Sequence, residues 1–209
     1  MNVAPGSGQI ITAPLILGAI LMVLTMLLGG ALWIQSLPLL LGVLGTAFFL
    51  IFFRDPGRDI PEKGIVSPAD GVVSLIDEKD GGKRVAVFMN VHNVHVNRAP
   101  ISGRILSVKH VSGGYLPAYR KDSDRNERMY IEMQTDIGKV TVVQIAGVMV
   151  RRIVTYVKPS ELVEKGQRIG MIRLGSRVDT IMPEGRVKII VNEGDKVKAG
   201  ETVIALPIE

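Results

Sequence analysis

The sequence predicts an all-β domain, a sandwich or barrel, preceded by an N-terminal hydrophobic helical hairpin. Residues 1–53 contain no Asp, Glu, Lys or Arg, so all 25 basic and 20 acidic side chains of the 209-residue chain lie in residues 54–209. From Ile65 onward, short β-branched or alternating segments are separated by Gly, Asp and Pro, which is typical of strands joined by turns. We therefore expect a helical hairpin over residues 1–53 and a β-rich domain over residues 54–209.

The hairpin consists of two apolar runs, Pro14–Ile34 and Leu37–Phe53, with Gln35 and Ser36 as the turn between them. As helices with a rise of about 1.5 Å per residue, the runs would measure roughly 31 and 26 Å, close to the thickness of the hydrocarbon core. A signal peptide would have a basic n-region and one shorter apolar core, and neither is present. The absence of charges also disfavours a hairpin buried in a protein core. We expect a membrane anchor with both ends on one side, whether it spans twice or dips into one leaflet.

Basic residues follow the hairpin directly at Arg54, Arg58 and Lys63. By the positive-inside rule, they predict that the β-rich domain lies on the cytoplasmic side of the cell membrane. The net charge of +5 is modest, both signs are interspersed and aromatic residues are few, which suits an anionic membrane surface and disfavours nucleic acid as a partner. The chain has no Cys, which excludes disulfides, thiol catalysis and thiolate metal sites.

The β-rich domain contains seven segments with strand patterns. They are Val72–Ile76, Arg84–Met89, Ile101–Val108, Met129–Met133, Val140–Ile145, Arg186–Val191 and Thr202–Leu206. Ser160–Lys165 is the exception, and we expect a helical turn there with Ser160 as its N-cap. Residues Val191–Glu201 resemble the turn region of biotinyl and lipoyl carrier domains but lack a Lys flanked by apolar residues, so they indicate a sandwich-like barrel and no carried cofactor.

Four polar side chains could take part in chemistry, although each also has an ordinary structural explanation. Ser176 follows Gly175, and a Gly-Ser pair between strands is usually a turn, as is the Ser-Pro-Ala-Asp-Gly sequence around Asp70. His92 and His95 would face opposite sides of a strand but the same side of a helical turn. Because no third ligand stands near this histidine pair, we expect no metal site. A hydroxyl, an imidazole and a carboxylate are nevertheless the parts of an activated nucleophile.

The order of five short motifs is more specific than any single one. They are Phe52–Pro56 (FFRDP), Val66–Gly71 (VSPADG), Val91–Pro100 (VHNVHVNRAP), Arg125–Arg128 (RNER) and Leu174–Asp179 (LGSRVD). From about Phe52 to the C-terminus, this series resembles the phosphatidylserine decarboxylase family, in particular its shorter bacterial and archaeal members. Longer members commonly have Leu-Gly-Ser-Thr at the cleavage site, where this chain has Arg177 after the serine.

The resemblance implies a proenzyme that makes its own cofactor. The precursor would cleave itself between Gly175 and Ser176 into a β chain of residues 1–175 and an α chain of residues 176–209, and Ser176 would become a pyruvoyl group. The mature enzyme would decarboxylate a serine phospholipid to the ethanolamine lipid. Phosphatidylserine and the ether-linked archaetidylserine have the same headgroup chemistry, so the lipid backbone stays open.

The resemblance also implies roles for individual side chains. His95, held by Asp70, would act as the general base on the Ser176 hydroxyl. Either His95 or His92 would protonate the product carbanion, and the sequence leaves this choice open. The headgroup phosphate needs cationic or backbone donors, and by charge the candidates are Arg120, Arg125, Arg128, Arg151 and Arg152.

Two other functions remain open on the sequence. The carrier-like tail would also suit a non-catalytic, membrane-tethered adaptor module, which would need no pocket containing Asp70, His95 and Ser176. A pyruvoyl decarboxylase of a soluble amino acid would leave the apolar hairpin without a purpose. The oligomeric state is equally open, and a homodimer is the commonest arrangement for an oligomer.

Overall fold

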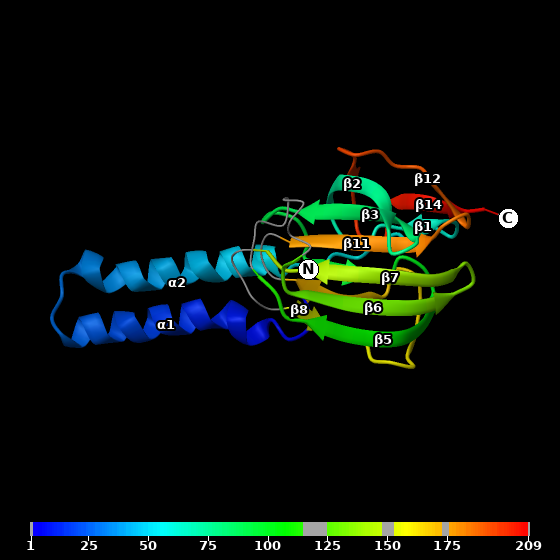
Figure 1. Ribbon diagram of the computed structural model, residues 1–209. Helices are drawn as coiled ribbons and strands as arrows, with labels where there is room; N and C mark the ends of the chain where they lie inside the picture. Colours follow the sequence, from blue (N-terminus) through cyan, green and yellow to red (C-terminus); the bar gives the residue numbers. More distant parts are fainter. Residues whose placement is uncertain (1, 115–124, 148–152, 173–175, 209) are drawn as a thin grey trace. The chain divides into compact units, whose positions relative to one another are not determined.

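The structure is a computed structural model that describes residues 2–114, 125–147, 153–172 and 176–208. The chain divides into two compact units, Met1–Pro56 and Gly57–Glu209. The first unit contains two helices and the second contains β-strands (Figure 1). The predicted fold class, a β-rich domain preceded by an apolar helical hairpin, is therefore confirmed.

The hairpin consists of α1 (Gly8–Leu27) and α2 (Leu32–Phe52), both long and apolar enough to cross a membrane by length and composition. The predicted turn at Gln35 and Ser36 is wrong, because the connection lies earlier and contains Gly29, whose φ of +71° favours glycine. Inside α2, the Gln35 side chain donates to the Gly30 carbonyl (2.7 Å) and the Ser36 hydroxyl to the Trp33 carbonyl (3.3 Å). Local carbonyls thus bind both polar side chains, and the helix continues through them.

The two helices approach most closely at a pair of glycines. A Cβ atom added to Gly18 would lie 2.5 Å from the Pro38 carbonyl oxygen, and one added to Gly42 would lie 2.6 Å from that of Pro14. Small residues at such positions allow helix backbones to pack closely in a membrane, where water does not drive helices together. The hairpin therefore depends on close backbone packing at Gly18 and Gly42.

Replacement of Gly42 by leucine is expected to destabilise the hairpin by about 1–3 kcal/mol, because the side chain would force the helices apart. Thermal unfolding of the full-length protein in detergent micelles, followed at the helical circular-dichroism band, measures this effect. Gly8→Leu is the matched control, since no atom lies within 4 Å of a Cβ at Gly8. Equal melting temperatures for the two variants would contradict this packing.

The described residues of the β-rich unit form three antiparallel sheets. In the eight-stranded sheet the strands follow the order β13 (Lys196–Val197), β2 (Gly71–Lys79), β3 (Gly82–Met89), β11 (Ser176–Pro183), β7 (Gly138–Ile145), β6 (Arg128–Thr135), β5 (Gly103–Val111) and β9 (Leu162–Val163). The two three-stranded sheets are β1 (Ile65–Val66), β14 (Val203–Pro207) and β12 (Val187–Ile189), and β4 (Val96–Arg98), β10 (Arg168–Ile172) and β8 (Ile153–Thr155). Figure 1 shows β11 between β3 and β7.

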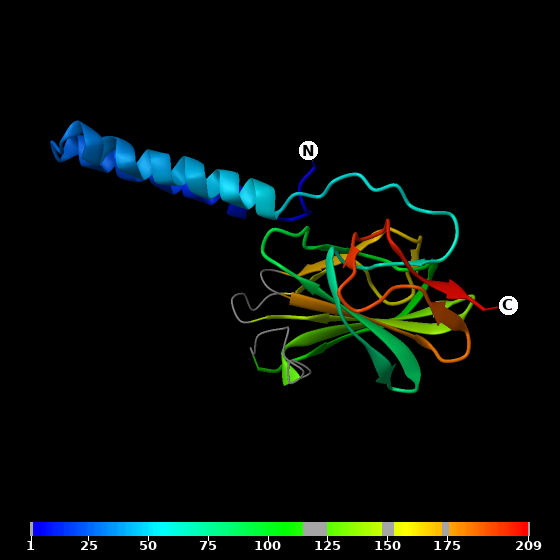
Figure 2. The same cartoon turned by 90° about the horizontal axis from the view of Figure 1, so that it is seen from above.

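One hydrophobic core joins the three sheets. Val87 of β3 and Val178 of β11 pack in it with Ile169 of β10 and Ile204 of β14. Figure 2 shows the small sheets lying over one face of the large curved sheet. Because side chains alternate along a strand, Ser176, two residues before Val178, shares the core-facing side of β11.

The structure bears out the predicted strand segments with small shifts at their ends, since they overlap β2, β3, β5, β6, β7, β12 and β14. The predicted helical turn at Ser160–Lys165 is wrong. Its residues Leu162–Val163 form β9, which pairs with β5. Ser160 has a φ of +72°, outside the extended region that an N-cap residue adopts.

Candidate active site

Three neighbouring strands of the large sheet, β2, β3 and β11, begin or end at the same end of that sheet. β2 begins at Gly71, β3 ends at Met89 and β11 begins at Ser176, which pairs with Met89. On the other side of β3, the register between β2 and β3 sets Gly71 beside the end of that strand. A side chain at Gly71 would collide with the carbonyl of Phe88, so this approach requires glycine. Asp70, which precedes Gly71, therefore lies at the same end of the sheet as Ser176.

His95 reaches this region from a different sheet. It directly precedes β4, which pairs with β10, and its carbonyl accepts a hydrogen bond from the Ile172 amide (3.3 Å). Ile172 ends β10, and only residues 173–175 separate it from Ser176. The His95 side chain is buried, with 1% exposure. Strand pairing thus brings the predicted imidazole and hydroxyl to one end of the domain.

The two histidines of the His-x-x-His motif lie in different environments. His92 is exposed in a turn, whereas His95 is buried in the extended segment that enters β4. Neither residue belongs to a strand or a helix. The expectation that the two side chains face opposite sides of a strand, or the same side of a helical turn, therefore does not apply. His95 thus lies at the same end of the domain as Ser176 and is shielded from water, whereas His92 is open to it.

Ser176 is fully buried, with 0% exposure, and its Oγ has no hydrogen-bond partner among the described residues. A buried hydroxyl without a partner costs free energy, and such groups in native proteins often belong to reacting sites. The Gly175 half of the predicted cleavage bond lies outside the described residues. The serine therefore has the burial and the unused hydroxyl that an internal nucleophile requires.

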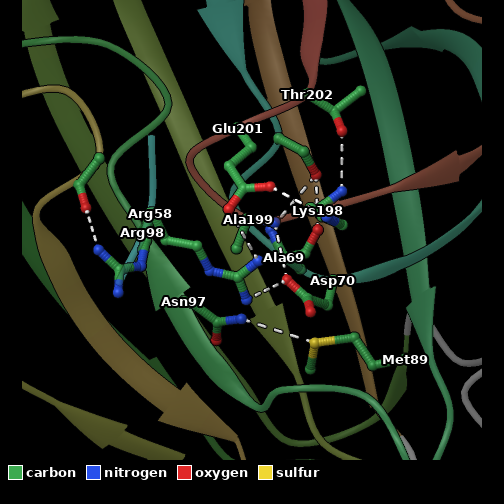
Figure 3. A network of polar contacts seen from close by, with 12 residues as sticks. Arg58, Ala69, Asp70, Met89, Asn97, Arg98, Lys198, Ala199, Glu201 and Thr202 are labelled. Carbon is green, nitrogen blue, oxygen red and sulfur yellow. Dashed lines mark hydrogen bonds and ion pairs between the residues drawn. The ribbon is translucent and has the colours of Figure 1, made fainter. Parts of the chain in front are cut away.

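A short polar chain runs beside Ser176 on the core side of the sheet. Gln144 Nε2 donates to Asn97 Oδ1 (2.7 Å), and Asn97 Nδ2 donates to the Met89 sulfur (3.6 Å; Figure 3). Met89 pairs with Ser176, and Gln144 pairs with Val178, two residues further along β11 on the same face. Neither amide was predicted from the sequence, although Asn97 belongs to the histidine motif and Gln144 interrupts an apolar strand.

Asp70 is held by two donors from distant parts of the chain. Its Oδ1 accepts hydrogen bonds from Arg58 Nη2 and from the Ala199 amide, both at 2.8 Å (Figure 3). From the sequence, Arg58 was predicted only to mark the cytoplasmic side of the membrane, and Ala199 was not predicted to take part in the site. The role of Asp70 toward His95 stays a prediction.

Comparison with known proteins gives this arrangement a family. A model of the phosphatidylserine decarboxylase family matches residues 46–205. The chain belongs to the phosphatidylserine decarboxylase family. The resemblance and the enzyme class predicted from the motif order are therefore confirmed, which argues against the non-catalytic adaptor.

Several relatives align with most of the chain at a sequence identity of about 50%. The phosphatidylserine decarboxylase proenzyme of Streptomyces coelicolor is 52% identical over 160 residues, which are 76% of this chain and 73% of the relative. That of Thermobifida fusca is 55% identical over 152 residues, 72% and 70% of the two chains. A Methanosarcina barkeri protein, provisionally named archaetidylserine decarboxylase proenzyme, is 51% identical over 162 residues, 77% of each chain. Members named for both lipids are thus similarly close to this decarboxylase.

Arg177, where longer members of the phosphatidylserine decarboxylase family commonly have threonine, lies on the face of β11 opposite Ser176. Its guanidinium binds both oxygens of Asp179 (2.7 and 3.0 Å), and Arg84 Nη1 lies 3.3 Å from the same carboxylate. All three residues are nearly inaccessible, at 3%, 1% and 6% exposure. Arg177 therefore takes part in a buried ion cluster on the far side of the strand.

Asp179→Ala is expected to destabilise this decarboxylase by about 3–5 kcal/mol, because it removes the carboxylate that the buried Arg177 guanidinium binds with two hydrogen bonds, whereas Arg84 keeps its ion pair with Asp77. Urea unfolding measures the loss. The control is Glu132→Gln, since Glu132 binds Ser107 and Lys139 in a more exposed position. That hydroxyl and ammonium lower the pKa of Glu132, so its small contribution is present above pH 4.5 and is lost as the pH falls through the lowered pKa. A smaller loss for Asp179→Ala than for the control would contradict the cluster's importance.

The arginines named by charge alone as candidates for binding the headgroup phosphate lie only partly within the described residues. Arg125 is exposed, and Arg128 donates to the Asn126 carbonyl (3.1 Å) and the Tyr130 hydroxyl (3.4 Å). Arg120, Arg151 and Arg152 lie outside the described residues. Within the described ranges, no group of three or more His, Asp or Glu could hold a metal ion.

Proposed function

We propose that this chain is a membrane-anchored proenzyme that cleaves itself between Gly175 and Ser176 and then decarboxylates a serine phospholipid. The observation that carries the proposal is Ser176 itself. Its buried Oγ has no hydrogen-bond partner among the described residues. Ser176 is also the first residue of β11, at the end of the sheet where Asp70 precedes β2. The names of the relatives supply the reaction class, since they are phosphatidylserine and archaetidylserine decarboxylase proenzymes.

Self-cleavage needs only groups of the chain and one water molecule. The Ser176 hydroxyl loses its proton to a base and attacks the Gly175 carbonyl carbon, and the peptide C–N bond breaks to give an ester and a free amine on Ser176. Removal of the Ser176 α-proton expels the Gly175 carboxylate and leaves dehydroalanine at position 176. Water then replaces the nitrogen, which leaves as ammonia, and a ketone remains. A glycine before the bond offers little steric resistance to this attack.

His95 is the base that we assign to the first step. An imidazole accepts and returns protons near neutral pH, so it suits both the removal of the hydroxyl proton and its later delivery. Burial of His95 keeps bulk water from competing for that proton. We assign Asp70 to orient the imidazole, as a carboxylate does in other activated nucleophiles.

The position of Ser176 also fits a pyruvoyl group, because its side chain occupies a buried core-facing position without a described hydrogen bond. Such a group supplies a ketone that binds the substrate amine and accepts electrons as carbon dioxide leaves. The residues around position 176 would exclude water from the reacting carbon. We assign the return of the proton to that carbon to His95 in preference to the exposed His92.

The hairpin supports a lipid as the substrate. Both helices are apolar and long enough to span a bilayer, and an enzyme attached to the membrane meets its lipid substrate at the bilayer surface. Arg54, Arg58 and Lys63 follow the apolar segment, which supports a cytoplasmic position for the β-rich domain.

The intact mass of the purified full-length protein, measured under denaturing conditions, tests the proposal. We expect two chains, the smaller beginning at residue 176 with a pyruvoyl mass and no free amine. A single chain that stays at the precursor mass and releases no carbon dioxide from either lipid after prolonged incubation would contradict it. Assays of phosphatidylserine and archaetidylserine vesicles side by side then identify the lipid backbone.

A further inference from the structure

We propose that Arg58, in the segment that follows the apolar hairpin, is a positioning residue for Asp70. The inference rests on the proposed function, because it assigns Asp70 a part in self-cleavage. Three sets of contacts carry it: those that dock the segment Gly57–Gly64, those of the Arg58 guanidinium, and those of the Asp70 carboxylate.

The segment Gly57–Gly64 is docked on two turns of the β-rich unit. The Ile60 side chain packs against Gly166 and Gly200, where an added Cβ would collide with it or lie 3.1 Å away. Lys165 Nζ donates to the carbonyls of Glu62 (2.7 Å) and Gly64 (3.3 Å). These contacts fix the backbone that follows Arg58 and so limit where its side chain can reach.

The Arg58 guanidinium is buried against two carboxylates. Its side chain is 4% exposed, with Nη2 at 2.8 Å from Asp70 Oδ1 and Nη1 at 3.6 Å from Glu201 Oε1. A buried guanidinium requires paired charge to offset its lost hydration, so the ion pair holds the Asp70 carboxylate against the buried cation. Figure 3 shows Arg58 extended toward Asp70.

The contacts of Asp70 leave one of its oxygens for catalysis. Both described hydrogen bonds, from Arg58 and from the Ala199 amide, end on Oδ1. The carboxylate is thus held by one oxygen, and Oδ2 is the oxygen that can accept a proton-bearing nitrogen of His95. Arg58 would therefore act through Asp70 without touching the reacting atoms.

The experiment compares self-cleavage of full-length variants made in the presence of lipid vesicles, with the cut and uncut chains separated on denaturing gels over time. Arg58→Met is expected to slow cleavage by on the order of tenfold to a hundredfold, since small errors in the placement of a catalytic group have effects of that size. Arg58→Lys, which keeps the charge, should recover much of the rate. Lys63→Met, a change of an exposed cation in the same segment, should cleave like the wild type.

Thermal unfolding of the same variants separates positioning from simple stabilisation. Equal melting temperatures for Arg58→Met and Arg58→Lys, with different cleavage rates, support the proposal. Equal rates for these two variants would overturn it, whether both are fast or both are slow. If the wild-type chain is never cut, both the proposed function and the role of Arg58 are contradicted. If the wild type is cut and Arg58→Met is cut at the same rate, only the role of Arg58 is contradicted.

Discussion

Ser176→Ala is expected to yield one uncut chain of 22.7 kDa with no decarboxylase activity. The substitution removes the hydroxyl oxygen that would attack the Gly175 carbonyl. Without the ester formed by that attack there is no leaving group for the elimination, so no dehydroalanine and no ketone can form at position 176. The fold should persist, because Ser176 Oγ has no described hydrogen bond to lose and a buried methyl group replaces a buried hydroxyl. The unfolding free energy is expected to equal or exceed that of the uncut wild-type precursor.

Thr180 provides a matched control for this experiment. It lies four residues further along β11 on the same face, is fully buried, and its Oγ1 also has no hydrogen-bond partner among the described residues. Thr180→Val therefore removes an equally buried hydroxyl and should be cut at the wild-type rate. Two chains from Ser176→Ala, in a gel or a denatured mass spectrum, would refute the cleavage scheme.

His95→Ala is expected to slow self-cleavage by about 10²–10⁴-fold, the usual contribution of a general base. Asp70→Asn should slow it as well, because a neutral amide no longer stabilises the imidazolium that forms as His95 takes the proton. His92→Ala is the contrasting variant, since His92 is exposed in a turn, and it should be cut at the wild-type rate.

Timed gels of newly made protein measure these rates, and decarboxylation of lipid vesicles by the cut variants adds a second readout. Wild-type cleavage of His95→Ala would remove this residue from the first step, and wild-type cleavage of Asp70→Asn would do the same for the carboxylate. A normally cut His92→Ala protein that has lost decarboxylation would move the return of the proton to His92.

The hairpin was predictable from composition, whereas its turn was not. A long segment without charges has few structures open to it other than a membrane anchor or a buried helix pair. The turn prediction failed because Gln35 and Ser36 bind nearby carbonyls, those of Gly30 just before α2 and of Trp33 within it, so polar side chains there do not end the helix. The connection depends instead on Gly29, one of many glycines in the apolar segment.

The strand β11 was missed although it lies inside the large sheet. Strand prediction relies on polar residues facing water, and here Ser176, Arg177, Asp179 and Thr180 are all buried. The two charged residues pair with each other on one face, and the two hydroxyls lie on the other. The polar residues of this strand therefore do not indicate which of its faces is exposed to water.

Only those residues of the candidate site that belong to the ordered motifs could be predicted from the sequence. That order pointed to Asp70, His95 and Ser176. Arg58 and Ala199 bind Asp70 from positions far apart in the sequence, and the pairing of distant segments is not visible in one chain. Ala199 moreover contributes a backbone amide, which has no side-chain signature.

The place of β11 has a consequence for how the active protein can be made. All eight residues of β11 pair with β3, and five of them also pair with β7. If the proposed cut occurs, this inner strand becomes the free start of the shorter polypeptide, held on both sides by the longer one. Refolding of the uncut chain is independent of concentration, but refolding of the two pieces requires them to meet and is second order. The mature enzyme is therefore easily reached only from its precursor, and denaturation after the cut would be difficult to reverse at low concentration.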